Sequence, residues 1–121
     1  MTLNQSFLLS ADELPIWFKY PQAFERIVEQ KLINITPWHI MTSEDVKVRY
    51  KGLSKRYPSR QLFPFAYRQD NDNVACWEAG EGEKVFVIYD FASPGWEDSR
   101  DNFDGVWSWL RSAVEDTIDW D

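Results

Sequence analysis

The chain has 121 residues with 20 acidic and 13 basic side chains, a net charge of −7, and 44% hydrophobic and 17% aromatic residues. This length suits one compact domain over residues 1–121, and the composition excludes the class of disordered chains. One cysteine and one histidine exclude an intramolecular disulfide and zinc sites built from His/Cys pairs, and the acidity argues against a general nucleic-acid binder, because Lys and Arg supply most non-specific affinity for phosphate.

The first half of the chain predicts two helices joined by a short strand. A proline opens the first helix, expected over residues 21–33, where its missing N–H would be unpaired in any case. Residues 35–41 are rich in β-forming side chains and predict the strand. The second helix, residues 43–57, is expected to be capped by the hydroxyl of Thr42 or Ser43.

The second half predicts three strands and a closing helix. The strands are expected at residues 62–67, 74–79 and 85–91, separated by turn sequences, and they read as an antiparallel meander. Gly80 and Gly82 supply the positive φ angles that a tight hairpin needs. The order of elements predicts the α+β class, with helices packed on an antiparallel sheet.

The closing helix is expected over residues 103–118, with Asp101 or Asn102 as its cap. Its apolar face is predicted to hold Phe103, Val106, Trp107, Leu110, Val114 and Ile118. The whole core is expected to include Phe24, Val46, Tyr50, Leu53, Phe65, Cys76, Val87, Phe103, Trp107 and Leu110.

Charge is distributed unevenly along the chain. Residues 1–69 carry ten basic and six acidic side chains, whereas residues 70–121 carry three and 14. Six of the basic residues lie between Lys47 and Arg60 and are interleaved with two tyrosines. Such a helix could track phosphate and stack on a base, or it could be a solvated face that complements the acidic half. We favour the second interpretation, because a protein of net charge −7 repels a polyanion.

No set of residues predicts catalysis, a metal site or a cofactor. Cys76 alternates with Val74 on a predicted strand, where a free thiol usually packs as a small hydrophobic group, and only His39 could act as its base. The turn over residues 70–73 resembles a calcium loop only superficially, since Ala75 replaces the glycine that such a loop requires. We therefore expect a protein that is not an enzyme.

Membrane insertion and secretion are not indicated either. The longest apolar runs contain only a few residues, far short of the roughly 20 that a spanning helix needs. The N-terminus has no basic residue before its short apolar stretch, unlike a secretory signal. A cytoplasmic location is therefore expected.

The second half contains a series of short motifs: the Phe63-Pro64-Phe65-Ala66 element, the turn at residues 70–73, the two following hydrophobic strands, and a last helix that begins near a phenylalanine. In this order they resemble the motifs of the SMI1/KNR4 family of the SUKH superfamily. The resemblance covers residues 14–120 and is strongest over 62–110. It implies a small intracellular α+β domain without enzymatic activity.

The resemblance also implies a binding function. Many bacterial members are immunity proteins that neutralise toxins, frequently nucleases, by binding them, while fungal relatives are regulatory interaction modules. A bacterial immunity-type protein is thus the expected function. The alternative is a regulatory, nucleic-acid-binding or phosphate-binding module that uses the basic helix 43–57.

The family shares no common set of toxin-binding residues, so the expected binding surface rests on charge alone. A nuclease presents a cationic surface, and an acidic patch speeds encounter with it and makes the contact specific. Trp96 lies in a predicted loop among carboxylates and suits an aromatic anchor. The predicted partner-binding residues are Asp70, Asp72, Glu81, Glu83, Trp96, Glu97, Asp98, Asp101 and Asp104.

Overall fold

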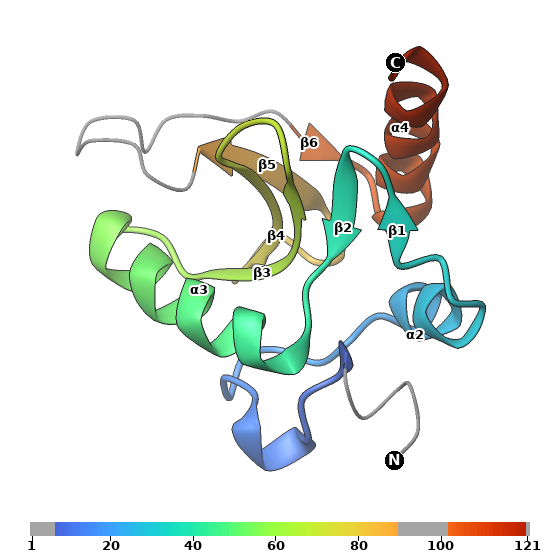
Figure 1. Cartoon of the computed structure of the whole chain (residues 1–121). Helices are drawn as coiled ribbons and strands as arrows, with labels where there is room; N and C mark the ends of the chain where they lie inside the picture. Colours follow the sequence, from blue (N-terminus) through green and yellow to red (C-terminus); the bar gives the residue numbers. More distant parts are fainter. Residues whose placement is uncertain (1–6, 90–101, 121) are drawn as a thin grey trace.

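A six-strand antiparallel sheet forms the centre of the computed structural model, which describes residues 7–89 and 102–120 (Figure 1). The strands lie side by side in chain order, and each pairs with the next in antiparallel fashion. The α+β class and the antiparallel meander are therefore confirmed. The strands are β1 Asn34–Ile35, β2 Trp38–Ile40, β3 Leu62–Arg68, β4 Asn73–Glu78, β5 Val85–Tyr89 and β6 Asn102–Phe103.

Helices pack on this sheet at different places. Helix α3 (Ser43–Arg56) lies along β3 and makes the most extensive contact between a helix and the sheet. The last helix, α4 (Val106–Asp119), contacts both edge strands, β1 and β6, and also α2 (Gln22–Glu29). The sheet is therefore strongly curled, and α4 lies between its two edges (Figure 1). A short 3-10 helix, η1 (Ala11–Glu13), precedes them all.

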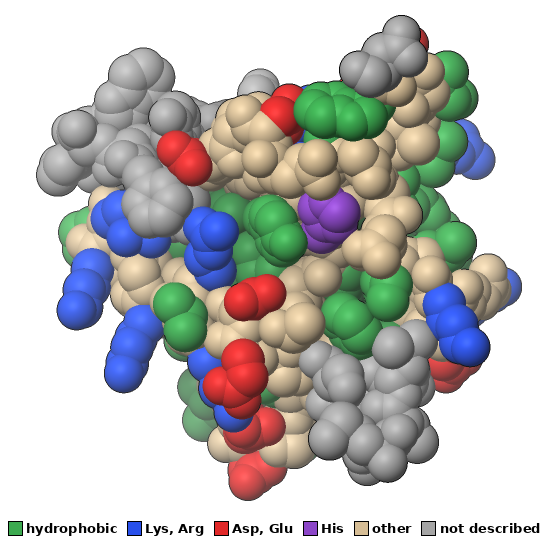
Figure 2. All heavy atoms as spheres, in the orientation of Figure 1, with side chains coloured by type: hydrophobic (Ala, Val, Ile, Leu, Met, Phe, Trp, Pro, Cys, Tyr) green, Lys and Arg blue, Asp and Glu red, His purple; other side chains and the backbone are tan. Residues whose placement is uncertain are grey.

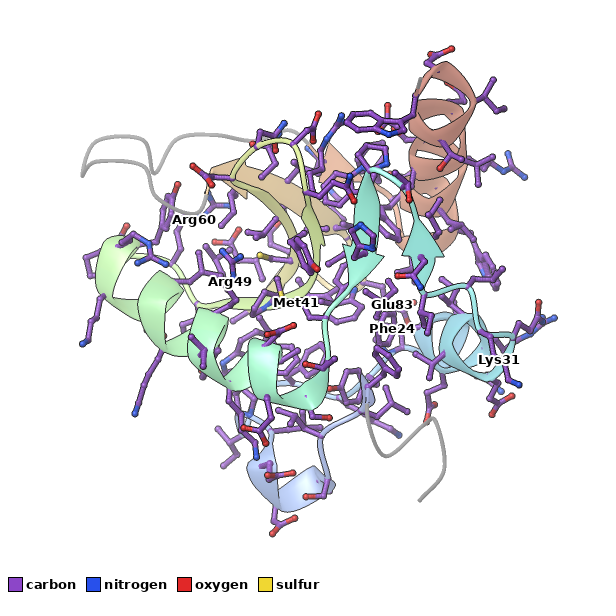
Figure 3. All side chains as sticks on the ribbon, in the orientation of Figure 1. Phe24, Lys31, Met41, Arg49, Arg60 and Glu83 are labelled. Carbon is purple, nitrogen blue, oxygen red and sulfur yellow. The ribbon has the colours of Figure 1, made fainter. Side chains whose placement is uncertain are left out.

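The local signals for helix ends differ in how well they predict the boundaries. Thr42 caps α3 as expected, since its Oγ1 accepts a hydrogen bond from the Asp45 N–H at 3.3 Å. Helix α2 ends at Glu29, four residues before the predicted end, because Lys31 adopts a left-handed φ of 62°. Its N–H and that of Leu32 bond back to carbonyls of the last turn, which is a Schellman motif without the usual glycine. Lys31 points away from the body of the protein there (Figure 3).

The hairpin between β4 and β5 has the predicted turn chemistry. Gly80 and Gly82 have φ angles of 84° and 63°, a region that other residues rarely adopt. The preceding pair, β3 and β4, has an irregular register between Pro64 and Ala66. Phe65 is the extra residue at this bulge, and its carbonyl accepts a hydrogen bond from the Met41 N–H at 2.8 Å.

Aromatic rings fill the interior between the curled sheet and α4. Phe65 stacks on Trp77 with ring centroids 4.3 Å apart and meets Trp109 of α4 edge to face at 5.0 Å. Trp109 in turn contacts Trp38 of β2 at 5.5 Å. Phe24 points inward from α2 and meets Trp77 at 5.2 Å (Figure 3). These contacts connect α2, α4 and the middle of the sheet in one core.

The orientation of α4 corrects the prediction for the closing helix. The helix begins at Val106 after Gly105, and Asn102 belongs to β6 rather than to a cap, while Asp101 lies outside the described residues. Its buried residues are Val106, Trp109 and Ala113, whereas Trp107 is 41% exposed. The helix carries two apolar stripes, and periodicity alone does not tell which of them meets the sheet.

The rest of the predicted core is largely confirmed. The fully buried residues among those predicted are Phe24, Val46, Leu53, Phe65 and Cys76. The residues that pack against the core while partly buried are Tyr50, Val87, Phe103 and Leu110. Across residues 7–89 and 102–120, the structure contains no helix with the length and apolar character needed to cross a bilayer.

Replacing Trp109 by alanine tests this orientation of α4. Trp109→Ala should lower the free energy of unfolding by about 3–5 kcal/mol, because it removes a buried ring and leaves a cavity. Trp107→Ala is the matched control on the same helix and should cost about 1 kcal/mol or less, as expected near the surface. Urea denaturation measures both. A larger loss for Trp107→Ala than for Trp109→Ala would show that the helix faces the other way.

Candidate functional site

The structure separates the predicted acidic residues into two groups. Asp70 and Asp72 lie in the turn between β3 and β4, whereas Glu81 and Glu83 lie in the turn between β4 and β5. Successive turns of an antiparallel meander are at opposite ends of their shared strand, so the two groups do not form one patch. The remaining predicted residues Trp96, Glu97, Asp98 and Asp101 lie outside the described residues.

Asp70 has a structural role that limits its use in binding. Arg68 donates two hydrogen bonds to its carboxylate, both at 2.9 Å, and this contact lowers the pKa of Asp70. Arg68 also reaches Asp116 of α4 at 3.2 Å, and Asp116 accepts a hydrogen bond from the Trp38 Nε1–H at 3.0 Å. The charge of Asp70 thus holds the turn and, through Arg68, α4. We therefore exclude it from the candidate site.

Asp104 belongs with the second group. Phe103 of β6 pairs with Val85, the first residue of β5, so the exposed Asp104 lies at the same end of the sheet as the β4–β5 turn. Glu81 and Glu83 are also exposed there. Within the part of the chain that the structure describes, none of these three carboxylates takes part in an ion pair.

A hollow beside the β4–β5 turn gives this end of the sheet its shape. It has a volume of about 480 Å³ and is lined by Lys19, Tyr20, Pro21, Gln22, Glu25 and Glu83. A smaller hollow of about 140 Å³ shares Lys19, Pro21 and Glu83 with it and extends to Trp17, Phe18 and Trp77. We call the two together the lead-in hollow, after the lead-in segment, residues 14–21, that forms one wall. The lead-in segment and the start of α2 form one side of it, and β4 with the β4–β5 turn, distant in sequence, forms the other.

Aromatic packing and hydrogen bonds hold the lead-in segment in place. Phe18 stacks on Phe63 at 4.5 Å and lies against Trp77 at 4.9 Å, and Trp17 meets Phe18 edge to face at 5.7 Å. The Tyr20 hydroxyl accepts a hydrogen bond from the Leu9 N–H at 3.1 Å, and burial raises the pKa of Tyr20. The floor of the hollow is therefore part of the core.

A salt bridge ties the start of this segment to α3. One oxygen of Glu13 accepts a hydrogen bond from the Ser10 N–H at 3.1 Å, and the other lies 2.9 Å from Lys47 Nζ. The hydrogen bond from Lys47, together with those from Ser10, lowers the pKa of Glu13 from its ordinary 4.5 to about 2. Glu13 is thus the carboxylate that joins η1 to α3.

The hollow combines an aromatic floor with a carboxylate rim. Glu25 and Glu83 reach it from α2 and from the β4–β5 turn, and among the described residues neither forms an ion pair. Lys19 is its single cationic lining residue among those the structure describes. Carboxylates beside aromatic rings suit a lysine or arginine side chain, which gains both charge attraction and a cation–π contact. The chemistry offered is therefore recognition of a cation.

Three of the six basic residues between Lys47 and Arg60 make described contacts within the protein. Lys47 binds Glu13 and Glu44, and Arg60, just after the helix, donates two hydrogen bonds to Glu78 at 2.7 and 3.0 Å. Arg49 lies over the ring of Tyr67 at 5.9 Å. Figure 2 shows Lys and Arg side chains gathered over α3. Internal pairing reduces the charge that this face can offer to phosphate.

The thiol and the imidazole do not form a catalytic pair. Cys76 is fully buried in β4. Both ring nitrogens of His39 are engaged by side-chain oxygens, Nδ1 by Asn34 at 2.9 Å and Nε2 by Gln69, and the ring stacks on Tyr67. In the described ranges, no group of three or more His, Cys, Asp or Glu side chains is placed to hold a metal ion.

Charge counting along the chain found Glu83 but missed the rest of the hollow. Glu25 and the lead-in segment belong to the half of the chain with net positive charge, so a search for acidic stretches passed over them. The available signal was the aromatic sequence Trp17-Phe18-Lys19-Tyr20 between two prolines. A proline-flanked aromatic segment predicts packing, and only the fold shows that it packs beside two carboxylates.

Comparison with known proteins adds no relative to this description. No protein-family model, curated protein or solved structure matches the chain. The protein is thus described by its own structure alone: an α+β domain whose lead-in hollow is a candidate cation-binding surface. The SMI1/KNR4 resemblance stays a hypothesis that rests on the short motifs.

The buried position of Cys76 predicts a thiol that does not react in the folded protein. A disulfide reagent at neutral pH should modify almost no Cys76 in the native state, because nothing in solvent can reach the sulfur. After unfolding in urea it should modify one thiol per chain. Fast stoichiometric reaction of the native protein would contradict the packing of β4.

The Glu13–Lys47 contact predicts a pH-dependent stability term at low pH. A folded-state pKa below the unfolded value stabilises the fold above pH 4.5, and this contribution is lost as the pH falls from 4.5 towards 2. NMR titration of the Glu13 carboxyl should give a midpoint near pH 2 in the wild type. In Lys47→Gln the midpoint should move towards 4.5. A wild-type midpoint near 4.5 would show that the salt bridge does not form in solution.

Proposed function

We propose that this protein is a non-enzymatic binding domain of the immunity type, which neutralises a cationic toxin domain by holding one of its basic side chains in the lead-in hollow. One observation carries the proposal. Glu25 and Glu83, from separate elements, both line the larger of two adjoining hollows, and Glu83 also lines the smaller one with the aromatic floor. Among the described residues neither carboxylate forms an ion pair.

Burial and charge both support a protein partner. The aromatic floor offers apolar contact area, and aromatic residues are enriched at the centres of protein interfaces. Ile16, fully exposed at the edge of the lead-in segment, adds apolar surface next to Trp17. A net charge of −7 attracts a cationic protein at long range, while the two carboxylates would fix its position at short range.

A toxin nuclease domain fits this chemistry. Such a domain binds polyanionic nucleic acid and must therefore expose lysine and arginine. A protein that binds those lysine and arginine side chains prevents nucleic acid from reaching them, and it needs no catalytic groups of its own. The short-motif resemblance to immunity proteins points to the same class of partner, and the partner itself would be encoded beside this gene.

Charge reversal at the hollow tests the proposal against the polypeptide encoded by the neighbouring gene. Glu25→Lys/Glu83→Lys should weaken binding about tenfold or more, because two attractive contacts become repulsive. The wild-type affinity should fall as salt rises from about 50 mM to about 300 mM. Isothermal titration calorimetry measures both effects.

The control is Glu44→Lys/Asp119→Lys, which makes the same change in net charge at two exposed positions outside the hollow. It should change affinity only slightly, through long-range attraction. Equal weakening by both double variants would show that net charge, and not the hollow, drives binding. Loss of binding only in Lys51→Glu/Lys55→Glu would move the site to α3 and support the alternative function.

A further inference from the structure

The outer face of α4 carries an apolar stripe that the fold of one chain does not use. Val106, Trp109 and Ala113 already bury the inner face of this helix against the sheet. Figure 2 shows hydrophobic side chains along the outer edge of α4, with a basic side chain beside them. The stripe consists of Trp107, Leu110, Val114 and Ile118.

The stripe is exposed to an unusual degree for such large side chains. Trp107, Val114 and Ile118 are 41%, 43% and 74% exposed, and Leu110 is half-buried beside them. An open hollow of about 450 Å³ lies along the helix and is lined by Trp107, Leu110 and Val114 together with the charged Arg111 and Glu115. Aligned apolar residues three and four positions apart form the kind of seam that packs against another helix.

Trp107 is held in place before any partner arrives. The guanidinium of Arg26, on α2, lies 5.8 Å from the centroid of its ring. Such a cation–π contact restrains the indole and reduces the conformational entropy lost when a partner covers it. The Trp107 ring is therefore already ordered in the monomer.

The charges beside the α4 stripe indicate what kind of partner can bind it. The only charged residues that line the α4 hollow in the described structure are Arg111 and Glu115, which cancel. Two copies of a protein with net charge −7 repel each other, so association is favoured at a surface where the local charges cancel or pair with those of the other copy. This stripe is such a surface.

We propose that the α4 stripe binds the same stripe of a second copy, with the two helices antiparallel about a twofold axis. Arg111 and Glu115 are one turn apart on the same side of the stripe. A twofold axis near residue 113 brings Arg111 against the partner's Glu115 and Glu115 against the partner's Arg111. The same axis passes near the middle of the apolar stripe, 107–118, so a single arrangement of the two helices forms both the apolar and the charged contacts.

The size of the surface predicts a reversible dimer. A helix of 14 residues is about 21 Å long, and its stripe occupies one side only. Such a contact is at the small end of specific interfaces. Association should therefore depend on protein concentration. This inference is independent of the proposed function, because the lead-in hollow and the α4 stripe share no residue.

Sedimentation velocity of the full chain between about 10 µM and about 500 µM tests the proposal. The wild type should shift with concentration from the monomer mass of 14.4 kDa towards twice that value. Val114→Glu should remain monomeric throughout. The matched control is Val48→Glu, which makes the same change at an exposed valine on α3 and should associate like the wild type.

Charge exchange tests the antiparallel arrangement itself. Arg111→Glu and Glu115→Arg should each weaken the dimer about tenfold, since each brings like charges together at both ends of the contact. The double variant Arg111→Glu/Glu115→Arg should restore wild-type association. A monomeric wild type at every concentration, equal behaviour of Val114→Glu and Val48→Glu, or a double variant no better than the single ones would overturn the proposal.

Discussion

The packing of Trp109 against the curled sheet is the interaction on which the rest of the fold depends. Its ring meets Phe65 in the middle of the sheet and Trp38 near one edge, and its helix contacts both edge strands. Because Phe65 also stacks on Trp77, this indole connects α4 with the aromatic cluster that supports the lead-in segment. The bulge at Phe65 and the orientation of α4 are thus parts of the same packing arrangement.

This arrangement also places the two candidate binding surfaces. The lead-in hollow has its aromatic floor because the lead-in segment packs its rings on Phe63 and Trp77. The α4 stripe faces outward because Trp109, and not Trp107, enters the core. One surface carries carboxylates and the other is mainly apolar, so a protein that uses both can bind a cationic partner and a second copy of itself without competition between them.

Sequence patterns predict the features of this protein that local chemistry controls. Thr42 as a cap, the glycines of the β4–β5 turn and the antiparallel meander all follow from rules that act within a few residues. The choice between two apolar stripes on α4 depends on which ring fills the curled sheet, and no local rule contains that information. The hollow is hard to predict for the same reason, since Glu25 and Glu83 are distant in sequence.

The two edge strands have a further consequence for the behaviour of the protein at high concentration. Exposed strand edges are templates on which other chains can add strands and begin aggregates. Here β1 and β6 contain only two residues each, and α4 contacts both of them. A second chain would find little free backbone there to extend the sheet. The helix that completes the core therefore also limits the addition of further strands at β1 and β6.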